Sequence, residues 1–558
     1  MRAPRRKLKT TPARSKLMAR VRHGGTAPEL AVRRLLKTLR ITFKTSGKGL
    51  PGTPDIVNTD DKWAVFVHGC FWHRHTGCKR ATTPKTNRGF WLKKFAQNRV
   101  RDKRKVAQLR KLGYTTVVVW QCELDEPSRV ARKLLKRLPR NRALGSAVSA
   151  RESYRLTASG SVIVREVRVE NGTTAVTSVS VPAGLKGDPV SLFDQAFLRR
   201  TEVPVAHPSG EPVRTVDLFS GCGGLSLGAL EACRAIGRPF EPVLAVDASE
   251  VSLGVYRRNL HPMWAYAGDI RRVIDGDYRA APTPKEELLA EFLGRIDLMV
   301  AGPPCQGHSD LNNHTRRTDE RNKLYERVGR FAEIVRPTNI VVENVRTIVH
   351  GKDGSLKRTA ERLVELGYAV DTGVVDALEL AVPQVRRRHV LLASLNKRLT
   401  IDDVLARHRT VAPRTVRWAI EDLAREHRNG IFTRPSRQSD KNRRRIKFLI
   451  TKGRVDLPNK QRPFCHRDGD HSYKSMYGRL SYDLPAATIT GGFGSPGQGR
   501  FIHPTQRRTL TPHEAARLQF FPDWFKFSDV ATRTALAKMI GNAVPMKLSY
   551  AFCLELLL

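Results

Sequence analysis

Asp217-Leu218-Phe219-Ser220-Gly221-Cys222-Gly223-Gly224 lies at the junction of a predicted strand, residues 213–219, and a predicted helix. Glycines in such a turn let the backbone approach a ligand closely, and the N-terminus of the following helix favours a carboxylate or a phosphate. A glycine-rich turn is weak evidence when taken alone, because many α/β folds use one for tight packing. The fold class is therefore inferred from the segments on either side of this turn.

Downstream of this turn, short apolar runs alternate with helical patterns. Runs at 243–246, 296–301, 339–342 and 389–393 are expected to be parallel strands beside 213–219. This alternation predicts a doubly wound α/β sheet for residues 213–395, of the Rossmann-like kind. From 396 to 480 the alternation fades and basic residues accumulate. It returns in 481–558, which close with a predicted helix after Pro545.

Upstream, residues 12–140 are predicted to form a separate, smaller α/β domain. Apolar residues spaced at i, i+3, i+4 and i+7 indicate an amphipathic helix that begins near Pro28-Glu29. Trp63–Val67 and Thr115–Trp120 are predicted as buried strands, with a basic helical stretch between them at 90–112. Residues 141–212 are interpreted as a linker. They contain a β-hairpin around Asn171-Gly172, to which we assign no chemistry.

Composition restricts the partner. The 558 residues contain 99 Lys and Arg against 53 Asp and Glu, a formal net charge of +46. So large an excess favours a polyanion, and double-stranded DNA is the expected partner. Hydrophobic residues make up 40% of the chain, which argues against a disordered protein, and no apolar run is long enough to cross a membrane.

The cysteines and the N-terminus indicate a location inside the cell. Eight cysteines in a chain of this length do not suggest a secreted disulfide framework. Residues 1–20 are basic but lack the apolar core of a secretory signal, so they are read as an arm that contacts DNA. We expect a bacterial cytoplasmic protein associated with the nucleoid, whose oligomeric state the sequence leaves open.

Three motifs supply the parts for attacking a flat, electron-poor heterocycle such as a pyrimidine. Gly302-Pro303-Pro304-Cys305-Gln306 offers a positioned thiol and Glu343-Asn344-Val345 offers a carboxyl group. Gln384-Val385-Arg386-Arg387-Arg388 offers paired guanidinium groups. A thiolate that adds to the ring and a carboxyl that stabilises the resulting charge together amount to covalent catalysis.

In this order, and with the closing Gly541-Asn542-Ala543-Val544-Pro545, the motifs resemble the DNA cytosine-5 methyltransferase family over residues 213–558. The resemblance implies a methyltransferase that extrudes the target cytosine from the helix and adds Cys305 to carbon 6 of the base. It further implies that Glu343 hydrogen-bonds the ring while Arg386 and Arg388 orient that carboxylate. The implied cofactor is S-adenosylmethionine, bound by Phe219, Gly221, Gly223, Asp247, Asp269, Ile270 and Asn542.

The basic segment 396–480 falls where this family places its target-recognition domain, so its Arg and Lys are expected to contact phosphates or guanine edges. Cys465, His466 and His471 have unconvincing spacing for a metal, and we expect no ligand role for them. One departure from the family is His308, which stands where many members carry an aromatic residue.

A second constellation lies in the N-terminal domain, where residues 67–78 read Val-His-Gly-Cys-Phe-Trp-His-Arg-His-Thr-Gly-Cys. Cys70, His75 and Cys78, joined by Cys122 after the later strand, would form a closed four-ligand site. Four such ligands with no open position suit structural Zn²⁺.

This part, residues 12 to 125, resembles the very-short-patch repair endonucleases, which implies a restriction-endonuclease-like core that nicks DNA beside the thymine of a thymine–guanine mismatch. By resemblance, Asp55 holds Mg²⁺, His73 activates the attacking water, and Glu29 and His68 assist. Departures are a longer His75–Cys78 interval and Val67 where some members carry Thr. Three aromatic residues would wedge into the base stack: Phe71, Trp72 and Trp91.

The two resemblances together predict a bifunctional enzyme. Deamination of 5-methylcytosine leaves thymine opposite guanine, so a mismatch nickase would initiate repair of lesions at sites that its neighbour methylates, with mismatch-repair proteins as expected further partners. Alternatives left open are a restriction nuclease that cuts the unmethylated site, an N-terminal domain that only binds DNA, and transfer RNA as the methyl acceptor.

Overall fold

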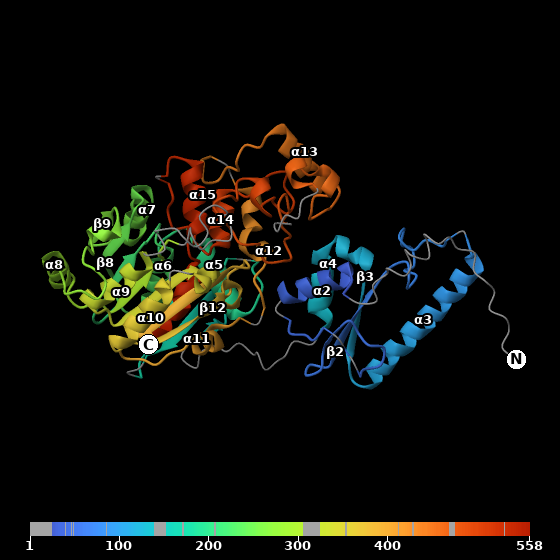
Figure 1. Ribbon diagram of the computed structural model, residues 1–558, viewed down its shortest axis with the longest axis horizontal. Helices are drawn as coiled ribbons and strands as arrows, with labels where there is room; N and C mark the ends of the chain where they lie inside the picture. Colours follow the sequence, from blue (N-terminus) through green and yellow to red (C-terminus); the bar gives the residue numbers. More distant parts are fainter. Residues whose placement is uncertain are drawn as a thin grey trace. The chain divides into compact units, whose positions relative to one another are not determined.

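The structure, a computed structural model, describes residues 25–558 except 39–40, 46, 48, 85, 139–151, 170–171, 183, 206–207, 305–323, 352–353, 411, 427–428, 468–474 and 529. The chain divides into two compact units (Figure 1). Unit 1 comprises Met1–Gly145 with Thr451–Val455, and unit 2 comprises Ser146–Ile450 with Asp456–Leu558. The predicted N-terminal arm, residues 1–20, lies outside the described residues.

Unit 1 has a three-stranded sheet in the order β1-β2-β3. Strand β2 (Trp63–His68) pairs antiparallel with β1 (Ile56–Asn58) and parallel with β3 (Thr115–Trp120), which confirms the two predicted strands. A parallel pair needs a long crossover, and the 24-residue helix α3 (Arg88–Lys111) provides it. The other elements among the described residues of this unit are α2 (Ala27–Thr38), η1 (Gln121–Asp125) and α4 (Pro127–Arg137).

Unit 2 is built on a seven-stranded sheet in the order β12-β13-β11-β10-β7-β8-β9. Strand β7, which leads into the glycine-rich turn, lies between β10 and β8 and is parallel to both. The doubly wound prediction is therefore correct for this part of the sheet. The strands are β7 (Val213–Leu218), β8 (Phe240–Asp247), β9 (Trp264–Ala267), β10 (Leu298–Ala301), β11 (Asn339–Val345), β12 (Ala369–Asp376) and β13 (Arg387–Ser394).

Helices cover both faces of this sheet because successive strand residues point to opposite sides. Val300 and Val341 pack into one apolar cluster, whereas Met299 and Ile340 pack into the other. The first cluster contains side chains of α6 (Gly224–Ile236), α11 (Ile401–His408) and α16 (Met546–Leu557), and the second those of α8 (Pro284–Leu293), α9 (Leu324–Val335) and α10 (Ser355–Glu365). Helix α7 (Glu250–Leu260) follows β8.

Strand β13 corrects one expectation. Residues 389–393 were predicted to run parallel to the other strands, but β13 is antiparallel to both β11 and β12. The connection from Asp376 to Arg387 contains only the short η6 (Ala377–Leu380). That length is insufficient for the crossover that a parallel neighbour requires, so the chain turns back beside β12.

The segment interpreted as a linker is part of unit 2. It contains the predicted hairpin, formed by β5 (Val162–Arg168) and β6 (Thr174–Ser180), extended to a three-stranded sheet by β4 (Glu152–Leu156). Helix α5 (Pro189–Arg199) follows, and Ser191 to Leu198 of it are buried. Val167 of β5 lies in the same apolar cluster as α6 and α16, so the segment packs on the core of unit 2.

The rest of unit 2 follows β13. A small apolar cluster of its own contains Ile446, Leu449, Leu457, Tyr477 and Ile502. The elements here are α12 (Val416–Ile420), η7 (Asp422–Arg425), α13 (Asp440–Thr451), η8 (Asn459–Gln461), η9 (Phe464–His466), η10 (Pro496–Gln498), α14 (Pro512–Leu518) and α15 (Arg533–Asn542). Among the described helices, none has the length and apolar character that crossing a bilayer requires.

Candidate active sites of the two units

The motifs of unit 2 meet at the carboxyl edge of its parallel strands. The Gly302 amide donates to the carbonyl of Leu218 at 3.0 Å, which joins the turn after β10 to the glycine-rich turn after β7. The side-chain amide of Asn344 (Nδ2) donates to the Pro303 carbonyl at 3.2 Å, which joins the end of β11 to the same place. Cys305, Gln306 and His308 lie outside the described residues, but Pro304, directly before the cysteine, is positioned at this edge.

Glu343 is a buried carboxyl group paired with a guanidinium. It is 8% exposed, and Arg388 Nε lies 2.8 Å from Glu343 Oε1. The sheet register explains the pairing, because Glu343 is opposite Val390 and Arg388 is opposite Val345, so the two side chains are diagonal neighbours on one face. Burial raises the pKa of Glu343, against the opposing charges of Arg388 and Arg386.

Arg386 has a different environment from Arg388. Its guanidinium is 2% exposed and donates to the carbonyl oxygens of Ile489, Gly541 and Ala543. It therefore fastens the strand that carries Arg388 to the C-terminal segment. The motif predicts that Arg386 and Arg388 act as one clamp on the carboxylate, whereas in the structure Arg388 makes the ion pair and Arg386 binds backbone.

The glycine-rich turn requires its glycines. Gly221 and Gly223 have φ of 54° and 94°, a region that disfavours other residues. A Cβ on Gly223 would lie 2.4 Å from Leu260, and one on Gly224 would lie 2.5 Å from the carbonyl oxygen of Val544. The second contact brings the closing Gly541–Pro545 motif, including the exposed Asn542, to the start of α6.

Asp247, the last residue of β8, binds both the glycine-rich turn after β7 and the segment directly after β8. One of its carboxylate oxygens accepts from the Gly221 amide and the other from the Ser249 amide, both at 2.8 Å. Burial raises its pKa. Further along, Asp269 caps η3 (Ile270–Arg272) and pairs with Arg271, which lowers its pKa, while Ile270 is buried beneath.

The region beneath the turn fits a polar ligand. Asp217 Oδ1 and Ser220 Oγ are buried and have no hydrogen-bond partner among the described residues. Burial raises the pKa of Asp217 to about 8, and its other oxygen accepts from Ser226 at 2.6 Å. Unsatisfied buried polar atoms are rare in native structures, and a zwitterionic, hydroxyl-bearing cofactor is of the class that such a cradle suits.

In unit 1, Asp55 and Glu29 lie near the start of the sheet. Asp55 Oδ2 accepts from the Val67 amide at 2.7 Å. Burial raises the pKa of Asp55, and the charge of Glu29 raises it further, against that hydrogen bond. Glu29 itself is 5% exposed and caps α2 by accepting from the Gly25 amide and the Thr26 hydroxyl.

Two stacked imidazoles lie at the end of β2 and directly after it. The rings of His68 and His73 lie parallel with centroids 3.9 Å apart. Burial lowers the pKa of His68 to about 4, so His68 is neutral near pH 7. His73 Nδ1 lies 2.6 Å from Asp102 Oδ2. Burial opposes ionisation of Asp102, but the hydrogen bond and charge of His73 outweigh it and lower the pKa of that carboxyl.

Asp102 is a candidate site residue that no sequence motif indicated. It lies on α3, far from the motif around His73. A signal was present, because Asp102 is the only acidic residue in a 24-residue helix crowded with Lys and Arg. A single carboxylate in so basic a helix is explained by its hydrogen bond to the imidazole of His73.

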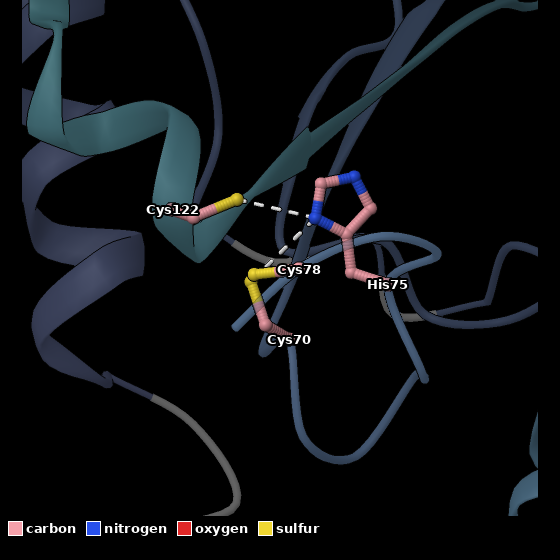
Figure 2. A group of neighbouring side chains, drawn as sticks. All are labelled: Cys70, His75, Cys78 and Cys122. Carbon is pink, nitrogen blue, oxygen red and sulfur yellow. Dashed lines mark hydrogen bonds between the residues drawn. The ribbon is translucent and has the colours of Figure 1, made fainter. Parts of the chain in front are cut away.

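The predicted metal ligands converge (Figure 2). One ligand atom from each of Cys70, His75, Cys78 and Cys122 lies within 4.8 Å of the others. His75 Nδ1 is 3.1 Å from Cys122 Sγ. Cys70, His75 and Cys78 follow β2, and Cys122 follows its parallel neighbour β3. Because the two strands are adjacent and parallel, their ends place the four side chains close together. The longer His75–Cys78 interval is accommodated by a turn in which the Cys78 amide donates to the His75 carbonyl at 3.3 Å.

The three predicted wedge aromatics form one cluster. The Phe71 ring centroid is 5.1 Å from that of Trp72 and 5.5 Å from that of Trp91. All three are partly exposed, whereas Phe95, which contacts Phe71, is buried. The cluster is thus anchored in the unit and open on one side.

Comparisons with known proteins assign both units. The profile of the family described as C-5 cytosine-specific DNA methylase matches residues 213–557. The profile described as DNA mismatch endonuclease Vsr matches residues 8–80.

Individual relatives agree with these profiles. Type II methyltransferase M1.BsuMI of Bacillus subtilis is 43% identical over 421 residues, covering 75% of this chain and 98% of that protein. That length exceeds 213–557, so the alignment extends upstream of residue 213. Two separate proteins of Xanthomonas oryzae match different parts. Type II nicking enzyme V.XorIIP is 46% identical over 118 residues (21% of this chain, 86% of that protein), and Type II methyltransferase M.XorII is 30% identical over 369 residues (60% and 82%).

Proposed function

Because this chain belongs to the C-5 cytosine-specific DNA methylases, and its N-terminal part to the Vsr mismatch endonucleases, we propose assignments for the individual residues of two active sites that act on DNA. Unit 2 methylates carbon 5 of cytosine with S-adenosylmethionine, and unit 1 nicks DNA at thymine–guanine mismatches. The observation that carries the first assignment is the buried Glu343–Arg388 pair beside Pro303–Pro304. The His73–Asp102 pair carries the second.

In unit 2, the Cys305 thiolate forms a bond to carbon 6 of the extruded cytosine. The electron pair displaced by this addition makes carbon 5 nucleophilic, and S-adenosylmethionine supplies the methyl group from its sulfonium. Loss of the carbon-5 proton to a base then re-forms the double bond and breaks the carbon–sulfur bond, which returns the thiolate.

Glu343 supports this addition by hydrogen bonding to ring nitrogen 3 and the exocyclic amine. Because burial raises its pKa, the carboxyl can hold a proton and donate it to nitrogen 3 as negative charge develops there. Arg388 fixes the direction of that carboxyl through the 2.8 Å pair.

In unit 1, His73 takes the proton from the water that attacks the scissile phosphate. Asp102 holds the imidazole by Nδ1, which leaves Nε2 free to accept that proton. Asp55 is the expected ligand for Mg²⁺, which would neutralise charge on the phosphate. The neutral His68 stacks on His73 and fixes its ring plane.

Zn²⁺ is the metal that the Cys70, His75, Cys78 and Cys122 set fits, because three thiolates and one imidazole would supply four ligands and leave no open position. Bound there, it would hold the ends of β2 and β3 together rather than react. We expect one tightly held zinc per chain by elemental analysis. Cys122→Ser should lose both the zinc and the thermal stability of unit 1, but not methylation.

The pairing of the two activities has a chemical reason. Every 5-methylcytosine that deaminates leaves a thymine–guanine mismatch in the methylated sequence. A nick beside that thymine gives downstream mismatch-repair proteins an entry point, and both steps take place on chromosomal DNA, at the nucleoid of a bacterial cytoplasm. Separate methyltransferase and nicking enzymes from one Xanthomonas strain match the two parts, which supports a shared purpose.

Cys305→Ser tests the methyl-transfer assignment. We expect this variant to lose methylation of duplex DNA and to retain nicking. The wild type should form a covalent adduct with duplex DNA containing 5-fluorocytosine in the presence of S-adenosylmethionine, and the variant should not. Absence of that adduct, under conditions where DNA and cofactor bind, would refute the assignment. Transfer RNA offered in parallel should accept no methyl group.

Matched and mismatched duplexes test the nuclease assignment. With Mg²⁺, a thymine–guanine duplex should be nicked and the fully matched, unmethylated duplex should stay intact. Cleavage of the matched duplex would instead make unit 1 a restriction nuclease. Mismatch binding without any nick, in the wild type and in His73→Ala alike, would make it a DNA-binding module.

A further inference from the structure

Phe464 is exposed without an obvious reason. It begins the short helix η9, and 87% of its surface is accessible, the largest fraction of any described large apolar side chain. A single exposed apolar residue is ordinary on a protein surface. An almost fully exposed phenyl ring on a hydrogen-bonded turn requires more explanation.

The turn under Phe464 is hydrogen-bonded. The His466 amide donates to the Pro463 carbonyl at 2.9 Å, and Arg467 Nε donates to the Arg462 carbonyl at 2.9 Å. Proline at 463 restricts the backbone directly before the ring. Phe464 is therefore presented from a defined turn.

This turn is attached to the small apolar core of the region that follows β13. Arg445 of α13 donates from Nε to the Gln461 carbonyl at 3.1 Å, and its guanidinium lies 5.4 Å from the ring centroid of Tyr477. Ile446 of α13 and Tyr477 both belong to that core cluster. A local core thus supports a turn whose one large apolar side chain points away from it.

The surroundings are strongly positive. Residues 440–450 and 456–467, which belong to unit 2, contain eight Lys and Arg but two acidic residues, Asp440 and Asp456. Both acids are paired with arginines, Asp440 with Arg443 and Asp456 with Arg500. The segment therefore carries a large excess of positive charge, and Lys460 and Arg467, which are near Phe464 in the sequence, are exposed; such a charge excess matches a polyphosphate backbone.

We propose that Phe464 is an aromatic wedge for duplex DNA, inserting between base pairs of the methylated sequence while the neighbouring cations hold the phosphates. An apolar ring has no partner on a phosphate backbone, but every opened base step offers it a flat apolar face. This inference rests on the proposed methyltransferase function. It adds a residue that helps to open the stack, in a region where positive charge alone would give binding without sequence preference.

The test compares Phe464→Ala with Phe464→Trp and with Lys460→Ala. The substrate carries the sequence identified by mapping methylated cytosines in DNA from cells that express the protein. Phe464→Ala should lower kcat/KM for methylation about 10- to 100-fold, the range of one lost stacking contact, and Phe464→Trp should retain most of it. Because the ring is exposed, all three variants should fold like the wild type, as thermal melting can verify.

The salt dependence of DNA binding separates the contribution of the Phe464 ring from that of the neighbouring cations. The slope of log binding constant against log salt should be unchanged in Phe464→Ala and reduced by about one in Lys460→Ala. With 2-aminopurine placed at successive positions of the sequence, wild-type binding should change the fluorescence at one step, and Phe464→Ala should abolish that change.

Equal kcat/KM and an equal fluorescence pattern in Phe464→Ala and wild type would overturn the wedge. That outcome differs from failure of the proposed function, in which wild-type protein itself would transfer no methyl group to any duplex and form no adduct with 5-fluorocytosine.

Discussion

At the scale of single residues, burial and pairing decide what each carboxyl group does. Burial dominates at Asp217, Asp247 and Glu343 and raises the pKa of each. At Asp102 the imidazole of His73 outweighs burial and lowers the pKa. The first three carboxyl groups therefore keep their protons to higher pH than free carboxyl groups do, whereas Asp102 is ionised more readily beside the imidazole.

Asp102→Asn is predicted to impair nicking. An amide in this position can orient His73 but cannot stabilise its protonated form, so the nicking rate should fall by about 100-fold or more. Single-turnover cleavage of a mismatched duplex measures it. Asp125→Asn, a change of an exposed carboxylate in the same unit, should leave the rate unchanged, and an equal loss in both variants would contradict the assignment.

His513 is predicted to give unit 2 a pH-dependent stability. Burial would depress its pKa, but hydrogen bonds to Asp523 and Glu426 outweigh that and raise the pKa to about 9. Since the unfolded value is 6.5, the contribution is complete below pH 6.5 and is lost as the pH rises through 9. It amounts to about 3 kcal/mol. Urea unfolding from pH 6 to 9.5 should show this decline in the wild type and in His350→Gln, and only a weak one in His513→Gln.

At the scale of elements, the β4–β6 sheet and α5 are held to the methyltransferase core by buried charges. Arg165 of β5 is 2% exposed, pairs with Glu231 of α6 at 2.9 Å and donates to the Tyr550 hydroxyl of α16 at 3.3 Å. Lys547 of α16 pairs with Asp194 of α5 at 2.7 Å. Ionic contacts buried to this extent hold the elements in one arrangement, because breaking any of them leaves a charge out of water.

Arg165→Ala is predicted to destabilise unit 2 by about 3–5 kcal/mol, because Glu231 would lose its main buried partner. Arg155→Ala, which removes an exposed arginine of the same sheet, should change stability by less than about 0.5 kcal/mol. Denaturant unfolding followed through a signal specific to unit 2 distinguishes them. Comparable losses in both would mean that the buried pair is not what holds the sheet in place.

At the scale of the whole molecule, the chain is two enzymes, and the boundary between them lies earlier than the family match suggests. The methylase profile begins at residue 213, but the compact unit begins at Ser146. Phe197 and Leu198 of α5 lie in the large apolar cluster that also contains α14 and α15 residues. Residues 146–212 therefore contribute core to unit 2.

Separating the chain at these two points should give opposite results. A fragment of residues 146–558 is predicted to fold and methylate DNA at a rate near that of the full chain. A fragment of residues 213–558 should be insoluble or inactive, because it lacks the partners of Glu231 and Lys547 and exposes the cluster that α5 covers. Methylation by the shorter fragment at the full rate would show that the segment is dispensable.

The sequence by itself determined the two chemistries, the parallel centre of the sheet, the hairpin near Gly172 and the four candidate metal ligands. These features are encoded in strand periodicity, turn residues and short sequence motifs, which can be recognised without knowing the tertiary fold. Only the tertiary structure decided that Asp102 reaches His73, that Arg386 binds backbone carbonyls, that β13 runs antiparallel and that residues 146–212 belong to the methyltransferase. Each of those depends on contacts between residues far apart in the chain, and such contacts are set by how the elements pack rather than by the local preference of any segment.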